Sequence, residues 1–333
     1  MTIGAPAELF SVGAVDKYFS GPGSVLQLYL PIGELTVNML LFLGMGGAVG
    51  FLSGMFGVGG GFLLTPLLIF TGISPAVAVA SVAPQIVASS TSGAIAYWRR
   101  RLIDEKMTLI LAAGGMLGST LGVYAFRAMR NLGQLDLIIG VAYVTFLGII
   151  GTIMLRESLR AMVRVRAGRP GTVRLPGQHN WIHGLPFKVR FRRSKLYVSV
   201  IPIIALGLGI GFLGTVLGMG GGFIMVPALI YLLRVPTNVV IGTSLAYTLL
   251  TMALATVLHS TANFSVDIVL ALILMIGGVI GAQFGAQVSQ ALRGEQLRAL
   301  LALLVLSVAL RFVFGLFATP DSVFSLSIAG AVH

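Results

Sequence analysis

The sequence predicts an all-α, polytopic membrane protein built from two inverted-topology repeats of about five helical segments each. The first observation behind this prediction is composition. Of the 333 residues, 56% are hydrophobic and only 10% are charged, and the mean hydropathy is +0.98. A soluble fold of this size cannot bury that much apolar surface, and the apolar runs approach the roughly 20 residues that a spanning helix needs.

The second observation is a glycine motif that occurs twice. Residues 57–66, GVGGGFLLTP, return as residues 218–227, GMGGGFIMVP, and the alignment holds without a gap from Gly50/Gly211 to Pro75/Pro236. Each copy breaks a hydrophobic helix at the same place. Paired breaks in two membrane repeats are typical of a transporter whose site lies between the repeats.

The elements follow from the apolar runs and the glycine breaks. We expect helical segments at 36–56, 61–72, 75–98, 107–129 and 134–155, and again at 196–217, 222–233, 237–259, 266–290 and 296–318. The second segment of each half is too short to span the membrane alone, so with the segment before it we expect a hairpin or broken helix. The regions are an N-terminal segment 1–35, a first repeat 36–155, a linker 156–195, a second repeat 196–318 and a C-terminal tail 319–333.

The third observation is the distribution of charge. Half of the chain's 22 basic residues lie in the linker 156–195, against the single acid Glu157, which indicates a cytoplasmic loop rather than a nucleic-acid-binding segment. The loop 99–106 is also basic, whereas its repeat-mate 260–267 has no Lys or Arg. If each half crosses the membrane an odd number of times, the second repeat is inverted relative to the first. The loop 99–106 then lies in the cytoplasm and the loop 260–267 lies outside, as their charges indicate. In this inverted topology Arg127 and Arg130 lie on the outer side of the membrane, which counts against it because basic residues concentrate on the cytoplasmic side.

The repeated motif suits an anion. Glycines leave backbone N–H groups uncovered, and a helix that starts just after them directs its free N–H groups and positive dipole end at the break. We therefore expect the two triplets to bind substrate: Gly59, Gly60, Gly61, Gly220, Gly221 and Gly222. The alternative role of a membrane glycine is close helix packing, which we expect for Gly46, Gly47, Gly114, Gly118, Gly277 and Gly281.

Side-chain candidates lie on the third segment of each half. Ser81, Gln85, Ser89 and Ser92 share one helix face, as do Ser244, Tyr247, Thr248 and Thr251 on the partner segment. From these sets Ser81, Gln85, Ser244 and Tyr247 are predicted to bind substrate, although hydroxyls can also bond to their own helix. Arg311, within an apolar segment, is a further candidate, with snorkelling to the interface as the alternative.

Enzyme chemistry is not expected. The chain has no Cys and only four His, and no His lies in a helical histidine–carboxylate motif. His179, Trp181 and His183 have a spacing that suggests a metal but lack a third ligand. We therefore predict no catalytic residues, no metal and no cofactor. The expected partners are a small anionic substrate and membrane lipid, with a homo-oligomer as a further option.

The doubled glycine motif, the Gly-Thr-Ser-Leu stretch at 242–245 and the glycine-rich fourth segments resemble the TauE/SafE family of sulfite exporter-like transporters over residues 36–318. The resemblance implies a multi-pass carrier of a bacterial inner membrane that moves sulfite, organosulfonates or related anions, and it adds Thr243 to the predicted site. An anion channel, or a carrier for small carboxylates, is the alternative. In the first half the aligned residues are Ser81-Val82-Ala83-Pro84, so the two halves are chemically unequal.

Overall fold

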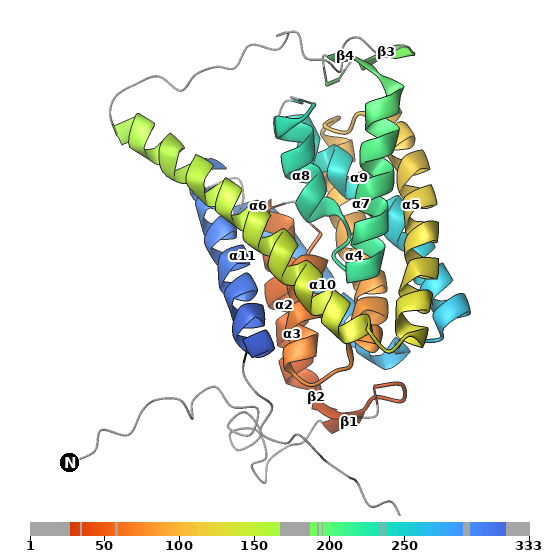
Figure 1. Ribbon diagram of the computed structural model, residues 1–333. Helices are drawn as coiled ribbons and strands as arrows, with labels where there is room; N and C mark the ends of the chain where they lie inside the picture. Colours follow the sequence, from red (N-terminus) through yellow and green to blue (C-terminus); the bar gives the residue numbers. More distant parts are fainter. Residues whose placement is uncertain are drawn as a thin grey trace, which may run out of the picture.

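The computed structural model describes residues 27–33, 35–56, 59–166, 187–191, 193–194, 196–233, 235, 237–288 and 294–317. These residues form ten α-helices, one short π-helix and two β-hairpins (Figure 1). Most of the predicted N-terminal segment and linker, including His179, Trp181 and His183, lies outside the described residues. So does the C-terminal tail.

The first half of the chain begins with a hairpin and continues with five helices. Its elements are β1 (Gln27–Tyr29), β2 (Thr36–Asn38), α2 (Met39–Phe56), α3 (Gly61–Phe70), α4 (Pro75–Arg99), α5 (Glu105–Asn131) and α6 (Leu135–Arg166). The second half repeats this order with one added π-helical turn. Its elements are β3 (Lys188–Phe191), β4 (Leu196–Ser199), α7 (Val200–Leu217), α8 (Gly222–Tyr231), α9 (Thr237–Leu258), η3 (His259–Asn263), α10 (Ile268–Val288) and α11 (Gly294–Phe317).

All ten predicted helical segments are present, with corrections at three boundaries. Residues 36–38 and 196–199, predicted as helix starts, are instead the second strands of antiparallel hairpins, in which Leu28 pairs with Val37 and Val189 pairs with Val198. Thr and Val favour strands, and a preceding turn closes each hairpin. Helix α6 also continues beyond 155 to Arg166, because the fall in hydropathy there marks a change of surroundings and not a loss of helix propensity.

Every long helix pairs mainly with a helix of the other half. Helix α2 packs on α10, α5 on α7, α4 on α9 and α6 on α11. Glycines make the first two pairs close: a Cβ added at Gly46 would lie 2.8 Å from the Leu274 carbonyl oxygen, and one at Gly118 would overlap the Leu208 carbonyl. The glycines predicted to pack are confirmed in that role, since each faces a neighbouring helix.

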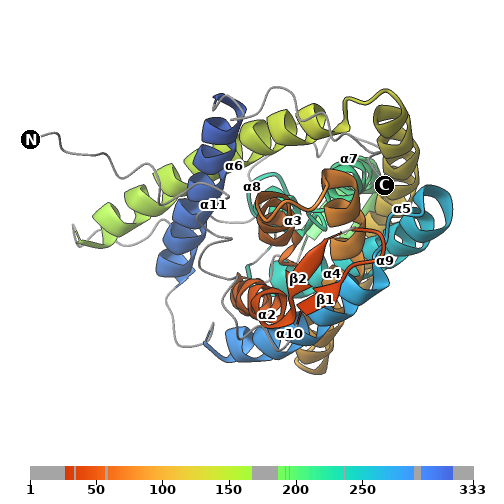
Figure 2. The same ribbon diagram turned by 90° about the horizontal axis from the view of Figure 1, so that it is seen from below.

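The two short helices occupy the middle of the bundle. Figure 2 shows α3 and α8 at its centre, surrounded by the longer helices. In Figure 1 the β1–β2 hairpin lies at one end of the bundle and the β3–β4 hairpin at the other. The hairpin that precedes the first half and the hairpin that precedes the second half therefore lie at opposite ends of the bundle.

Length and apolar composition make six of the described helices suitable for crossing a membrane. They are α2, α5, α7, α10, residues 137–156 of α6, and α9 together with η3. Helix α4 is long enough but carries a run of serines with Gln85, and most of these polar side chains are buried. The fold is that of a multi-pass membrane protein, and α4 carries a row of polar side chains that face the interior of the bundle.

Candidate functional site

The two glycine motifs form matching breaks between helices. Gly59 and Gly60 have φ values of +83° and +55°, and Gly220 and Gly221 have φ values of +75° and +70°. This left-handed backbone explains why glycine occupies these positions. Gly60 and Gly221 are the N-cap residues of α3 and α8, and neither helix has a side-chain cap. The first N–H groups of both helices are therefore free of side-chain acceptors.

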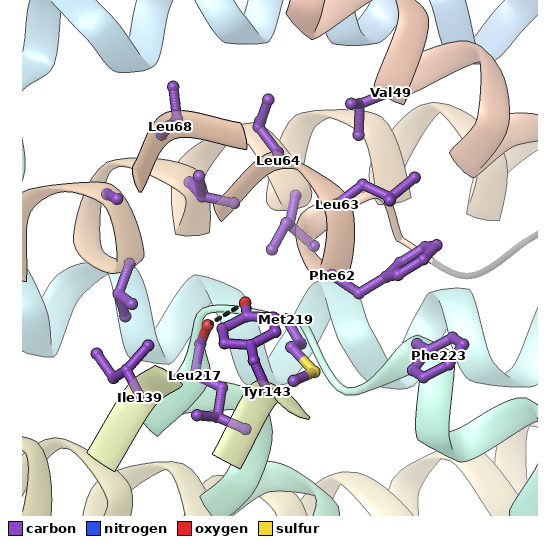
Figure 3. Close-up of a cluster of buried hydrophobic side chains, with 14 of the residues drawn as sticks. Val49, Phe62, Leu63, Leu64, Leu68, Ile139, Tyr143, Leu217, Met219 and Phe223 are labelled. Atoms are coloured by element: carbon purple, nitrogen blue, oxygen red, sulfur yellow. Dashed lines mark hydrogen bonds between the residues drawn. The ribbon is translucent and has the colours of Figure 1, made fainter. Parts of the chain in front are cut away.

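The two breaks lie against each other. Thr65 of α3 donates a hydrogen bond of 3.1 Å to the Gly218 carbonyl, and a Cβ added at Gly61 would lie 2.6 Å from the same oxygen. The rings of Phe62 and Phe223, each one residue into its helix, stack with centroids 4.7 Å apart (Figure 3). The N-terminal turns of α3 and α8 therefore meet at one place, which we call the break junction (residues 59–62 and 218–223).

A buried cluster holds the break junction in position. The Tyr143 hydroxyl, from α6, donates a hydrogen bond of 2.7 Å to the carbonyl of Leu217, the last residue of α7 (Figure 3). Apolar side chains from α2, α3 and α6 belong to the same buried cluster as Tyr143, among them Val49, Leu64 and Ile139. Sequence reasoning did not single out Tyr143 or Thr65, because their partners lie in the other half of the chain.

Two side chains that carry free hydroxyls lie beside the break junction. Ser90 and Thr248 are buried, and neither hydroxyl has a hydrogen-bond partner among the described residues. A Cβ added at Gly59 would lie 3.8 Å from the Ser90 Oγ and 3.4 Å from the Thr248 Cγ2, and one at Gly220 would lie 3.3 Å from the same Cγ2. Unpaired buried hydroxyls are uncommon, and two beside the buried, uncapped N-termini of α3 and α8 suit a polar ligand. Ser90 was missed because it lies off the predicted face.

Gln85 is also buried without partners. Neither of its amide atoms has a hydrogen bond within the described structure, and its Nε2 occupies the space left by the absent side chain of Gly278. Gln85 therefore points from α4 to α10, whereas its neighbour Ile86 contacts Gly59, Gly61 and Gly220. Its assignment to the substrate site stays a prediction, and the free amide supports it.

The other predicted side chains are engaged with protein groups. Ser81 and Thr243 accept hydrogen bonds from the backbone N–H groups of Asp267 (2.9 Å) and Asp104 (3.2 Å). The Ser244 hydroxyl donates to Ile241 O (2.9 Å), and that of Tyr247 donates to Gly207 O (2.7 Å). These four residues are buried in the paired helices α4 and α9. Their role as substrate ligands stays a prediction.

Arg311 lies away from the break junction. Its guanidinium is 4.9 Å from the ring centroid of Phe70, the last residue of α3. At 1.5 Å per residue, Phe70 is about 13 Å along α3 from Gly61. Arg311 therefore sits at the end of α3 opposite the break, in a cation–π contact.

Two buried aspartates connect the halves, and sequence reasoning did not predict them. Asp267 caps α10 through Oδ1, and its Oδ2 accepts from the N–H groups of Ile32 (2.9 Å) and Gly33 (3.2 Å) in the β1–β2 turn. Asp104 caps α5 in the same way, and its Oδ2 accepts from the N–H (3.0 Å) and hydroxyl (2.8 Å) of Ser194 in the β3–β4 turn. The β1–β2 hairpin, which precedes the first half, is thus bound by Asp267 of the second half. The β3–β4 hairpin, which precedes the second half, is bound by Asp104 of the first.

A bundle of spanning helices around two converging helix breaks defines a multi-pass membrane protein of the transporter class. The chain belongs to the family described as sulfite exporter TauE/SafE, whose model matches residues 42–312. It is 27% identical over 282 residues to a probable membrane transporter protein, YjnA, of Bacillus subtilis (strain 168), which covers 84% of this chain and all of the relative.

Other relatives agree with this membership. The chain is 28% identical over 281 residues to a probable membrane transporter protein of Xylella fastidiosa (strain 9a5c), covering 83% of this chain and 95% of the relative. It is 31% identical to sulfite exporter TauE/SafE family protein 5 of Arabidopsis thaliana, over 30% of this chain and 22% of that protein. No solved structure matches the chain.

Proposed function

We propose that this protein is a carrier that moves small anions across a bacterial inner membrane by alternating access. The substrates best supported are sulfite, organosulfonates and related sulfur-containing oxyanions, because the family is described as sulfite exporters and the break junction offers donors to an oxyanion. The observation that carries the proposal is the meeting of two uncapped helix N-termini beside the free hydroxyls of Ser90 and Thr248.

The physical reason is the cost of removing an anion from water. A bare ion in hydrocarbon is unfavourable by tens of kcal/mol in the simplest continuum treatment, so several donors must replace its hydration shell. Helix N-termini provide backbone N–H groups and a positive dipole end without a buried cation. Hydroxyls can add donors whose orientation adapts to the bound oxygen atoms.

We also propose that the two halves form inverted-topology repeats with the basic linker in the cytoplasm. The hairpins at opposite ends of the bundle and the exchanged aspartate contacts support this arrangement. The structure also gives a reason for one charge that opposes it. Arg130 donates hydrogen bonds to Asn263 O (3.0 Å) and to the Ser265 Oγ (2.6 Å), so it serves to hold this loop.

The proposed function is tested by removing the free hydroxyls. Ser90→Ala and Thr248→Val should each weaken anion affinity about 3- to 10-fold, the effect of losing one neutral hydrogen bond, in flux assays on purified protein in liposomes. Folding should be unaffected because neither hydroxyl has a hydrogen-bond partner in the part of the protein that the structure describes. Thr256→Val is the matched control, since the Thr256 hydroxyl bonds to Met252 O within its own helix.

The substrate panel should contain sulfite, sulfonates and small carboxylates. Saturable flux that is accelerated by anions on the opposite side marks a carrier, whereas unsaturable flux would show a channel. Unchanged affinity in both hydroxyl variants would remove the break junction from the substrate path. Preference for carboxylates over every sulfur oxyanion would contradict the substrate class while leaving the site in place.

A further inference from the structure

A cavity of about 430 Å³ lies between the last turns of α4 and α10, separate from the break junction. Its lining includes the small residues Gly93, Ala96 and Ala286. Its polar lining comes from both halves of the chain: Ser92, Tyr97, Arg99, Arg100, Gln283 and Gln287. The described lining contains no carboxylate.

The cavity adjoins an exposed apolar face of α10. On α10 the large exposed residues Leu272, Ile276 and Ile280 recur at helical spacing, and the same stripe continues as the exposed Gln283 and Gln287. This face changes from aliphatic side chains to amides over the last two turns of α10, and the exposed Phe284 and Val288 keep apolar surface beside them at the same level.

Helix α4 indicates the depth of this cavity. Trp98 is 64% exposed beside the cavity, and exposed tryptophans concentrate at the interface between lipid and water. The adjacent Arg99 and Arg100 are exposed, and the structure gives neither of them a salt bridge within its described residues. Of the two nearest acids in sequence, Asp104 accepts hydrogen bonds from Met107 and Ser194, and Glu105 pairs with Arg193. Two guanidinium groups are therefore free at headgroup depth.

We propose that this cavity binds the phosphate-containing headgroup of an anionic phospholipid. Arg99 and Arg100 would contact the phosphate oxygens through the donor geometry that suits guanidinium. The amides of Gln283 and Gln287 would bind the polar glycerol region, and the acyl chains would lie along the apolar stripe of α10. A basic pocket between spanning helices at the membrane surface is a physically reasonable lipid site. This inference does not depend on the transported substrate.

Lipid retention by the purified full-length protein tests the proposal. After equilibration in detergent with mixed phosphatidylglycerol and phosphatidylcholine, native mass spectrometry should show preferential retention of phosphatidylglycerol by the wild type. The double variant Arg99→Gln/Arg100→Gln should lower that retention at least tenfold. The double variant Gln283→Leu/Gln287→Leu keeps the charge and should lower it several-fold.

The matched control is Arg127→Gln/Arg156→Gln, which removes two exposed arginines elsewhere and should retain phosphatidylglycerol like the wild type. Equal retention by the wild type and the Arg99/Arg100 variant would overturn the proposal. Displacement of the lipid by glycerol phosphate or sulfate would also overturn it, because the site would then bind soluble anions. If the arginine-to-glutamine variant does not fold, Arg99→Lys/Arg100→Lys takes its place, with partial retention expected because lysine keeps the charge but not the planar donor fork.

Discussion

At the scale of single residues, the candidate site is distinguished by polar groups that have no hydrogen-bond partner among the described residues. A buried polar atom without a partner is unfavourable to folding, so its presence at the centre of a membrane protein calls for another role. Ser90, Thr248 and Gln85 share this condition. Tyr143, Tyr247, Ser81 and Thr243 do not, because each has a definite protein partner.

The role of Gln85 can be tested by removing its amide group, whose burial without a hydrogen-bond partner in the described part of the chain is unfavourable to folding. We expect Gln85→Met, which keeps the volume and removes both amide atoms, to leave thermal stability unchanged or to raise it by up to about 1 kcal/mol. Flux in liposomes should fall, because a ligand or a moving helix loses a donor and an acceptor. A stability loss greater than about 2 kcal/mol would show that the amide has a structural partner.

At the scale of elements, Asp267 and Asp104 form two equivalent contacts, each of which connects a hairpin to the opposite half of the chain. Asp267→Asn places an NH₂ group among four N–H donors, so the β1–β2 turn should lose its anchor. Hydrogen exchange of the Ile32 and Gly33 amides should accelerate at least tenfold, since hydrogen bonds to charged groups contribute about 1.5–3 kcal/mol each. The β3–β4 turn should be unaffected.

Asp104→Asn is the reciprocal experiment. It should accelerate exchange at Ser194 and leave Ile32 and Gly33 protected. Loss of protection in both hairpins from either single substitution would argue for general destabilisation and against two separate contacts.

Glycine packing between α5 and α7 gives a second test at this scale. Gly118→Ala should destabilise the protein by roughly 2 kcal/mol or more, because the added methyl overlaps the Leu208 carbonyl and must separate two helices. Gly209→Ala and Gly148→Ala have open space at the Cβ position, and each should be neutral or stabilising by up to about 1 kcal/mol. Thermal unfolding in detergent measures all three. Similar midpoints for the three variants would contradict close packing of these helices.

At the scale of the whole molecule, the proposed orientation can be measured because the chain has no Cys. A cysteine at Arg100 should be shielded from an impermeant thiol reagent in intact cells, whereas one at Phe264 should be labelled. Both residues are exposed and lie in loops at matching positions of the two halves. Labelling of both from the same side would contradict the inverted arrangement.

The sequence alone determined the ten helical segments, the position of the two breaks and the family. These features are local, because hydropathy runs, glycine triplets and short segments can be recognised without knowledge of residues far away in the sequence. Local patterns also located the backbone part of the candidate site at Gly59–Gly61 and Gly220–Gly222. Boundaries were less accurate where strand-forming residues or good helix formers extended past a change in hydropathy, as at 36–38 and at the end of α6.

Only the tertiary structure decided which polar side chains are free and which are satisfied. Ser81 and Gln85 share one helix face, yet Ser81 is paired with Asp267 and Gln85 is unpaired. Asp104 and Asp267 belong to short loops in the sequence, and their burial is possible because donors from the opposite half of the chain surround them. Hydrogen-bond satisfaction depends on contacts between residues far apart in sequence, and no local pattern encodes it.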